Sequence, residues 1–148
     1  MIPAPRRVFL DTNVFLAAVD LARPEKPHAV RVLKEWPAAG VALYTSTQVM
    51  REFLVVATRP TDANGLGLTL ADALSNASEF AQVATVLPET LATWRKLLAV
   101  LPDSSISGAR IHDANIAACA LANGISTVVS ANTADFESLP VEVMGLGS

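Results

Sequence analysis

The segment Arg7-Val8-Phe9-Leu10-Asp11-Thr12-Asn13 decides the fold. Three apolar residues follow Arg7 and end at Asp11, which is the pattern of a short strand buried on both faces, as in a parallel sheet. Three polar side chains come directly after that strand, and buried polar groups need hydrogen-bond partners or a ligand. Because ligands of open parallel sheets bind beyond the carboxyl ends of the strands, Asp11 is the first candidate site residue.

Short apolar strands and helices alternate through the rest of the chain. Further strands are predicted at residues 41–44, 126–130 and 141–144, and the pattern also allows one at 85–87. Apolar periodicity, caps and proline breaks predict helices at residues 14–19, 27–36, 47–58, 70–81, 89–101 and 110–123. This alternation predicts a three-layer α/β/α sandwich with a central, mainly parallel sheet. The 148 residues contain no linker or repeat, so we expect a single domain over residues 1–148.

Composition excludes several classes of protein. Hydrophobic residues make up 51% of the chain and charged residues 17%, as in a folded globular domain. The net charge of −3 gives no support to a scaffold that holds nucleic acid by charge alone. No apolar run approaches the roughly 18 residues of a membrane helix, and no secretory signal is recognisable. Cys119 is the single cysteine and cannot form an internal disulfide, which favours the cytoplasm.

Four acidic residues fall at places where an acid is informative. Asp11 follows the first strand, Glu52 lies at the margin of the apolar face of helix 47–58, Asp113 lies near the start of helix 110–123, and Asp135 follows a late strand. Each has an ordinary structural explanation, such as a helix cap, a boundary glutamate or a favourable charge at a helix N-terminus. The functional inference therefore rests on the four residues together.

Four segments, in their order and local sequence, resemble the PIN-domain family, and in particular the VapC-like toxins of bacterial toxin–antitoxin modules. The segments are L-D-T-N from Leu10, Q-V-M-R-E-F from Gln48, R-I-H-D-A-N-I-A-A from Arg110 and S-A-N-T-A-D-F from Ser130. The resemblance spans nearly the whole chain, from the first strand to the last. It implies a PIN-like fold and metal-dependent ribonuclease activity, with Mg²⁺ or Mn²⁺ as the cofactor.

The resemblance also implies roles for individual residues. Asp11 and Asp113 match the family's principal metal-ligating aspartates, and Glu52 matches the helical glutamate of its acidic cluster. The fourth polar position falls between Asn132 and Asp135, and the sequence leaves open which of the two faces the metal.

Other polar residues receive supporting roles. Thr12, Asn13 and Ser130 are expected to orient Asp11 or to hold metal-bound water, as groups around metal ligands usually do. Many relatives have threonine where this chain has Ser130, and the hydroxyl is kept. Arg110 and Arg51 are candidates for contacts with substrate phosphates, or are solvated helix charges.

Clustered carboxylates suit this chemistry. Mg²⁺ and Mn²⁺ prefer oxygen ligands, and a bound divalent ion lowers the pKa of a water and stabilises charge on a phosphodiester. Carboxylates packed together repel one another, which raises one or more of their pKa values until a cation binds.

The resemblance further implies an RNA substrate, a small VapB-like antitoxin that occupies the catalytic groove, and a toxin homodimer. Two alternatives within the family remain open: a non-catalytic PIN-fold binding module, and a PIN nuclease outside a toxin–antitoxin system. A phosphatase with an aspartyl nucleophile is disfavoured, because Asn13 occupies the position that needs a second acid. A dinucleotide-binding enzyme is disfavoured because no G-x-G-x-x-G follows the first strand.

Overall fold

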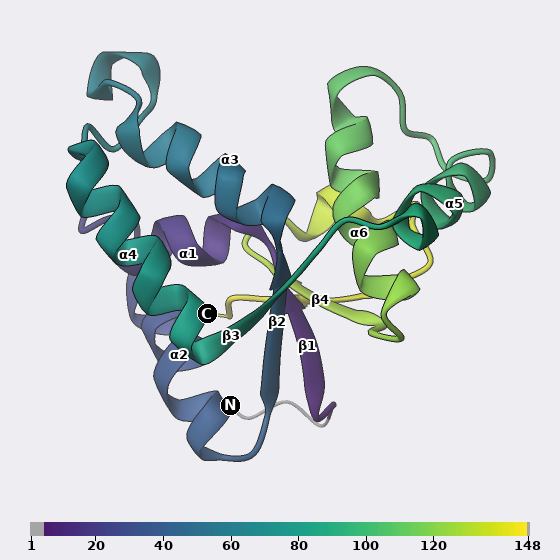
Figure 1. Cartoon of the computed structure of the whole chain (residues 1–148), viewed down its shortest axis with the longest axis horizontal. Coiled ribbons are helices and arrows are strands. Elements are labelled where there is room, and N and C mark those ends of the chain that lie inside the picture. The colour runs from purple at the N-terminus through teal and green to yellow at the C-terminus, as the bar shows by residue number, and fades with distance from the viewer. Residues whose placement is uncertain (1–4, 148) are drawn as a thin grey trace.

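A five-stranded sheet forms the middle layer of the computed structural model, which describes residues 5–147 (Figure 1). All of its described strand pairs are parallel, and the spatial order is β3-β2-β1-β4-β5. The strands are β1 (Arg7–Leu10), β2 (Ala42–Ser46), β3 (Ala84–Leu87), β4 (Thr127–Ser130) and β5 (Glu142–Gly145). This architecture confirms the predicted α/β sandwich with a mainly parallel sheet.

The central strands are buried because helices cover both faces of the sheet. Val8, Phe9 and Leu10 of β1 are fully buried, and every residue of β4 is buried. Leu10 pairs with Val129, and the backbone N–H of Asp11 donates to the carbonyl oxygen of Val129 at 3.0 Å. The carboxyl ends of β1 and β4 therefore lie side by side, and the polar residues that follow them meet at one edge of the sheet.

Helices form the two outer layers. One side carries α1 (Thr12–Val19), α2 (Lys26–Ala38), α3 (Thr47–Thr58) and α4 (Leu70–Val83), and the other carries α5 (Leu91–Val100) and α6 (Ile111–Ala122) (Figure 1). Phe80 of α4 joins the first group, because its ring centroid lies 4.7 Å from that of Phe15 and 5.2 Å from that of Phe53. Within residues 5–147, none of the helices has the length and apolar character needed to cross a membrane.

Every predicted helix and strand is present within two residues of its expected bounds. The end of α2 shows why the bounds shift. Pro37 was expected to end this helix at Trp36, but the helix continues to Ala38. Pro37 lies one residue before the helix end, so its missing N–H removes a single intrahelical bond, and the Ala39 N–H still donates to the carbonyl oxygen of Glu35 at 3.0 Å.

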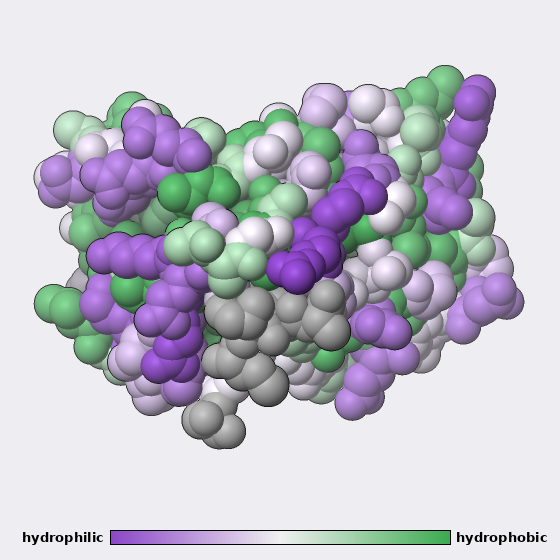
Figure 2. Space-filling model, turned by 90° about the horizontal axis from the view of Figure 1, so that it is seen from below, coloured by the Kyte–Doolittle hydropathy of each residue, from purple (hydrophilic) through white to green (hydrophobic). Residues whose placement is uncertain are grey.

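The two ends of the sheet differ in character. Figure 2 views the molecule from the end at which β1 and β2 begin, where hydrophilic residues alternate with smaller hydrophobic areas. The acidic residues singled out in the sequence lie at the opposite end, where the strands finish.

Candidate active site

A cleft of about 300 Å³ lies beyond the carboxyl ends of β1 and β4. Its lining contains seven of the polar residues predicted from sequence, contributed by four separate segments: Asp11, Thr12, Asn13, Glu52, Asp113, Asn132 and Asp135. Of the remaining predicted residues, Ser130 lies beneath the cleft floor and Arg110 lies at its edge. Arg51 is not part of the cleft lining, and its guanidinium lies beside Glu89. The structure therefore brings the four candidate carboxylates into one place.

Asp11 is the most buried of these carboxylates, with 6% of its surface exposed. Its Oδ2 accepts a hydrogen bond from the Ser130 hydroxyl at 2.8 Å, and its Oδ1 accepts one from the backbone N–H of Thr12 at 2.8 Å. Burial raises the pKa of Asp11 from 3.8 to about 6, against the lowering effect of these two bonds, and the charges of Asp113 and Glu52 raise it further. Asp11 also caps α1, as its ordinary structural explanation predicts, and the same residue lines the cleft.

Buried polar groups hold Asp11 in place from below. The Ser130 hydroxyl is completely buried, and it accepts from the Asn13 amide at 3.3 Å and from the backbone N–H of Asn132 at 2.9 Å. The Asn13 side-chain oxygen accepts from the backbone N–H of Ala131 at 2.9 Å. Ser130 supplies the hydroxyl that these contacts require.

Both carboxylate oxygens of Glu52 are occupied. Oε1 accepts from the Thr12 hydroxyl and Oε2 accepts from the Gln48 amide, each at 2.9 Å. Glu52 is half-buried, as its place at the margin of the apolar face predicted. Gln48 was not predicted as a site residue, although it lies one helical turn before Glu52 and therefore on the same face of α3.

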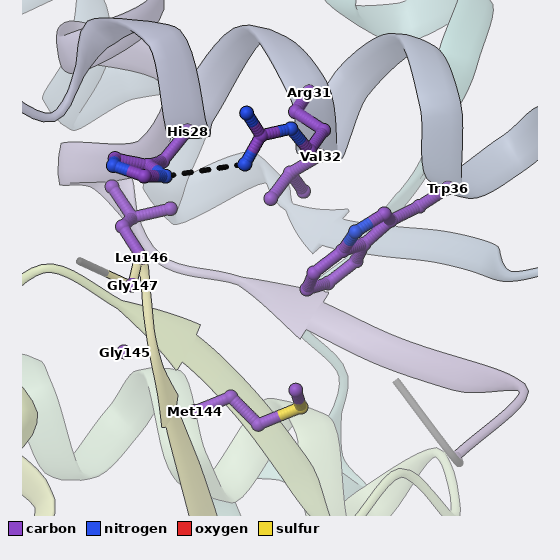
Figure 3. Close-up of a pocket in the computed structure, with 8 residues that line it drawn as sticks. All are labelled: His28, Arg31, Val32, Trp36, Met144, Gly145, Leu146 and Gly147. Carbon is purple, nitrogen blue, oxygen red and sulfur yellow. Dashed lines mark hydrogen bonds between the residues drawn. The ribbon is translucent and has the colours of Figure 1, made fainter. Parts of the chain in front are cut away.

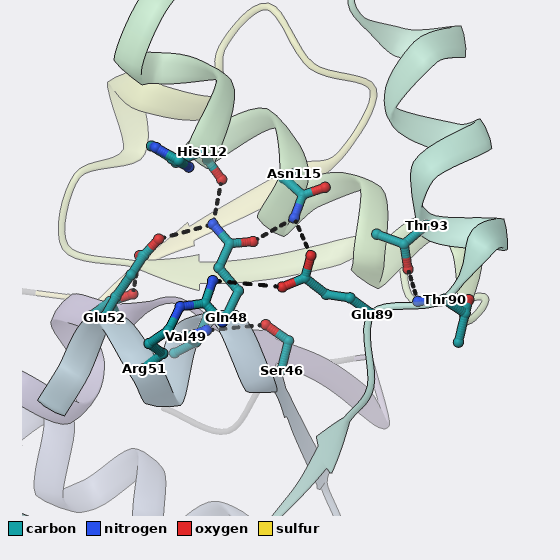
Figure 4. Close-up of polar contacts among 11 residues, drawn as sticks. Ser46, Gln48, Val49, Arg51, Glu52, Glu89, Thr90, Thr93, His112 and Asn115 are labelled. Carbon is teal, nitrogen blue, oxygen red and sulfur yellow. Dashed lines mark hydrogen bonds and ion pairs between the residues drawn. The ribbon is translucent and has the colours of Figure 1, made fainter. Parts of the chain in front are cut away.

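Gln48 connects this site to the opposite helical layer (Figure 4). It is only 2% exposed, and its amide also donates to the backbone carbonyl of His112 at 2.9 Å and accepts from Asn115 at 2.7 Å. Asn115 in turn donates to Glu89 at 3.1 Å, and the Arg51 guanidinium lies 4.0 Å from Glu89. Glu52 is therefore held by a network that ties α3 to α6 and to the segment before α5.

Asp113 faces Asp135 across the other side of the cleft. Asp113 is half-buried, and its pKa is raised first by burial, then by the charges of Asp135 and Glu52, while Arg110 lowers it. The Arg110 Nε lies 4.0 Å from Asp113, and its Nη2 donates to the backbone carbonyl of Asp135 at 2.9 Å. The guanidinium of Arg110 is thus engaged within the protein, at the edge of the acidic cleft.

The donor set suits a hard divalent cation. Carboxylate oxygens are the ligands that Mg²⁺ and Mn²⁺ prefer. Across residues 5–147, no three His, Cys, Asp or Glu side chains converge closely enough to surround an ion by themselves. An ion held by Asp11 and Asp113 would therefore complete its coordination with water, which is how Mg²⁺ usually binds. A cation would also offset the repulsion that raises the pKa values of these two residues.

A second pocket, of about 180 Å³, lies between α2 and the end of β5 (Figure 3). It is lined by His28, Arg31, Val32, Trp36, Met144, Gly145, Leu146 and Gly147. None of these lining residues carries a carboxylate, so this pocket lacks the oxygen ligands of a magnesium site. The acidic cleft is the candidate active site.

Comparisons with known proteins identify the family of this chain. A family model described as PIN domain matches residues 8–141, which is most of the chain. The chain belongs to the PIN domain family. All four cleft carboxylates lie within the matched part of this PIN domain, and the resemblance seen in the sequence is confirmed. A comparison with curated proteins found no match.

Solved structures share the fold of this PIN domain. A chain of the VapBC2 complex from Rickettsia felis, bound to a DNA fragment from its promoter, gives a TM-score of 0.70 at 16% identity, over 94% of this chain and 98% of that chain. A chain of VapBC-1 from nontypeable Haemophilus influenzae gives 0.67 at 16% identity, over 96% and 99%. Mycobacterium tuberculosis VapC20, described as a toxin that cleaves the sarcin–ricin loop, gives 0.60 at 17% identity, over 82% and 86%. At these identities the likeness shows the fold.

Proposed function

We propose that this PIN domain is a metal-dependent endoribonuclease that hydrolyses RNA phosphodiester bonds with Mg²⁺ or Mn²⁺. The observation that supports this function best is the meeting of Asp11, Glu52, Asp113 and Asp135 in one cleft at the carboxyl end of a parallel sheet. The family membership and the structural likeness to VapC20, a toxin that cleaves the sarcin–ricin loop, support RNA as the substrate.

Each acidic residue has a part in the proposed reaction. Asp11 and Asp113 hold the cation, with Ser130 and the Thr12 N–H keeping Asp11 in position. When bound, a divalent cation lowers the pKa of a water, polarises the phosphoryl oxygen and stabilises charge on the leaving oxygen. Glu52, whose oxygens are fixed by Thr12 and Gln48, orients the attacking water. Asp135 adds the negative charge that draws the cation toward Asp113.

The same proposal makes the chain the toxin of a VapBC-type pair. Its partners are then a small VapB-like antitoxin, whose segment occupies the cleft, and a second copy of the chain. Support comes from the structural likeness to chains of VapBC complexes. Expression in a bacterial host should arrest growth, and co-expression of a neighbouring small gene should restore it. RNA cleavage without growth arrest would indicate a PIN nuclease outside a toxin–antitoxin system.

A nuclease assay tests the activity itself. Purified protein is incubated with RNA and Mg²⁺ or Mn²⁺, with EDTA, the Asp11→Asn variant and the Asp103→Asn variant as controls. Asp103 is exposed and lies outside the cleft lining. The Asp103→Asn variant therefore makes the same change in net charge as Asp11→Asn without altering the cleft. EDTA should abolish cleavage, and Asp11→Asn should lower it by roughly 100-fold or more, because even partners of metal ligands contribute about 10-fold to 100-fold. Metal binding without cleavage of any RNA would indicate a non-catalytic module.

A further inference from the structure

Arg59 places a positive charge inside this acidic cleft. It directly follows α3, and its side chain lines the cleft together with Arg23 and Asn64. Its Nη2 donates to the backbone carbonyl of Asn64 at 3.3 Å. Its Nε is buried and has no hydrogen-bond partner in the part of the chain that the structure describes. A guanidinium carries five N–H donors, and the bond to Asn64 uses one of them.

Arg59 also has no ion-pair partner among the described residues, unlike the other arginines at or beside the cleft. Three of them have a carboxylate within 4.0 Å: Arg23 with Asp20, Arg51 with Glu89, and Arg110 with Asp113. Among residues 5–147, no carboxylate lies within that distance of Arg59. Arg59 is therefore the cleft arginine that remains available to an anion.

The loop after Arg59 holds its backbone firmly. The Gly65 N–H donates to the carbonyl oxygen of Pro60, and the Gly67 N–H donates to that of Arg59, both at 2.9 Å. The loop packs so closely that a Cβ on Gly65 would lie 1.9 Å from the Arg59 carbonyl oxygen. The bond to Asn64 comes from the same loop. The guanidinium is thus pre-positioned at the cleft, which lowers the entropy cost of binding a ligand.

We propose that Arg59 binds a substrate phosphate adjacent to the one that is hydrolysed, an inference that rests on the proposed nuclease function. A guanidinium binds phosphate through paired, charge-assisted hydrogen bonds. The acidic residues bind the scissile phosphate through the cation, so a separate cationic group in the same cleft suits a neighbouring phosphate of the strand. The preferred substrate is then a single-stranded RNA segment with at least one phosphodiester beyond the scissile bond. A small diester would leave Arg59 without a ligand.

Two substrates separate this contact from the chemistry. Cleavage of a single-stranded oligoribonucleotide is compared with cleavage of bis(p-nitrophenyl) phosphate, which has no second phosphate. For Arg59→Gln we expect KM for the oligoribonucleotide to rise about 10-fold. The kcat/KM for the small diester should stay within about twofold, because the reacting phosphate keeps its contacts. Arg95→Gln is the matched control, since Arg95 is an exposed arginine on α5 outside the cleft lining.

Binding provides a readout that a merely structural role would not change. The Kd of a non-cleavable 2′-O-methyl oligonucleotide is measured by fluorescence anisotropy over a range of salt concentrations. Loss of one phosphate contact should lower the slope of log K against log salt by about 0.7 in Arg59→Gln. Arg59→Lys keeps the charge and should keep most of the slope, and Arg95→Gln should keep all of it.

The outcomes distinguish this inference from the proposed function. An unchanged KM and salt slope in Arg59→Gln, with RNA cleavage by the wild type, would overturn the phosphate contact alone. An equal loss of activity on both substrates would place Arg59 in the chemistry or the fold and would also overturn it. Weakened competition by poly-glutamate, with unchanged oligonucleotide binding, would assign Arg59 to an acidic peptide instead. A wild type that binds with the expected slope but cleaves neither substrate would refute the nuclease function and leave the contact standing.

Discussion

At the scale of single residues, the buried carboxylate of Asp11 lowers the stability of the fold when it is ionised and no cation is bound. Its carboxylate is 6% exposed and has the charges of Asp113 and Glu52 nearby, with no ion-pair partner within 4.0 Å in the described residues. Two hydrogen bonds hold it, yet its pKa is raised to about 6. Ionised Asp11 therefore costs folding free energy unless a cation is bound.

In EDTA, Asp11→Asn should be more stable than the wild type at pH 7.5. The pKa of Asp11 rises from 3.8 to about 6 on folding, so the native state favours the protonated form. The destabilisation is fully present above pH 6 and disappears as the pH falls from 6 toward 4. The gain from Asp11→Asn should be on the order of 1 to 3 kcal/mol at pH 7.5 and close to zero near pH 4.

Urea unfolding of both proteins at pH 4, 6 and 7.5 measures this difference. A variant that is less stable than the wild type by the same amount at every pH would show that the hydrogen bonds of Asp11 outweigh its burial.

The sequence identified the residues whose position depends on local structure. Asp11 follows a buried strand, and Asp113 lies in the first turn of a helix, so both could be placed from apolar patterning and helix signals. Gln48 and Arg59 were missed as site residues. The role of Gln48 depends on contacts with α6, and the role of Arg59 depends on a contact with the loop after α3. Neither contact can be predicted from the local sequence.

At the scale of elements, α3 presents the candidate glutamate Glu52 to the cleft, and the N-terminal half of this helix is anchored on both sides. Ser46 caps this helix through a bond from the Val49 N–H at 3.3 Å, and Gln48 links it to α6. The buried side-chain amide of Gln48 makes hydrogen bonds with both of its N–H donors and with its oxygen acceptor. The orientation of Glu52 therefore depends on two helices from opposite layers.

Gln48→Met should lower both stability and kcat. Methionine has a similar volume but leaves the His112 carbonyl and the Asn115 amide without their partner, which costs roughly 1 to 3 kcal/mol. Glu52 also loses the bond to its Oε2, so kcat should fall by about 10-fold with a smaller change in KM. Urea unfolding and steady-state RNA cleavage measure the two effects, with Gln82→Met on the exposed face of α4 as the control. A large loss of stability with unchanged kcat would show that Gln48 serves the fold alone.

Helices and strands were predictable because their signals are local. Three buried apolar residues and a polar stop mark β1, and Thr69 marks the start of α4 by accepting from the Asp72 N–H at 3.1 Å. The exact ends depend on tertiary contacts. The last turn of α2 continues through Pro37, where packing of the buried Trp36 favours helix over the break that proline alone predicts.

At the scale of the whole molecule, the parallel sheet is what unites the site. The order β2-β1-β4 puts three strand ends beside one another, and each is followed by a segment that contributes a cleft residue. Alternation of strands and helices predicts such a sheet, but the strand order and the depth of the cleft depend on the folded structure. The family resemblance, and not spacing, indicated which distant acids would meet.

Mn²⁺ or Mg²⁺ should stabilise the whole protein at neutral pH. A ligand that binds only the native state at tenfold above its Kd adds about 1.4 kcal/mol, which corresponds to a rise in Tm of roughly 3 to 6 °C for a chain of this size. Thermal unfolding with and without metal measures the shift. Asp11→Asn should lose most of it, while Asp103→Asn should keep it. The same metal-induced shift in Asp11→Asn and in the wild type would remove Asp11 from the set of ligands.

The most direct test of the central claim is an anomalous diffraction experiment on crystals grown with Mn²⁺. We predict a manganese peak in the cleft at the ends of β1 and β4, within ligand distance of Asp11 and Asp113 and with waters completing its coordination. The peak should vanish in crystals of Asp11→Asn. Manganese bound elsewhere, or a cleft whose carboxylates stay without metal at saturating concentration, would contradict the account.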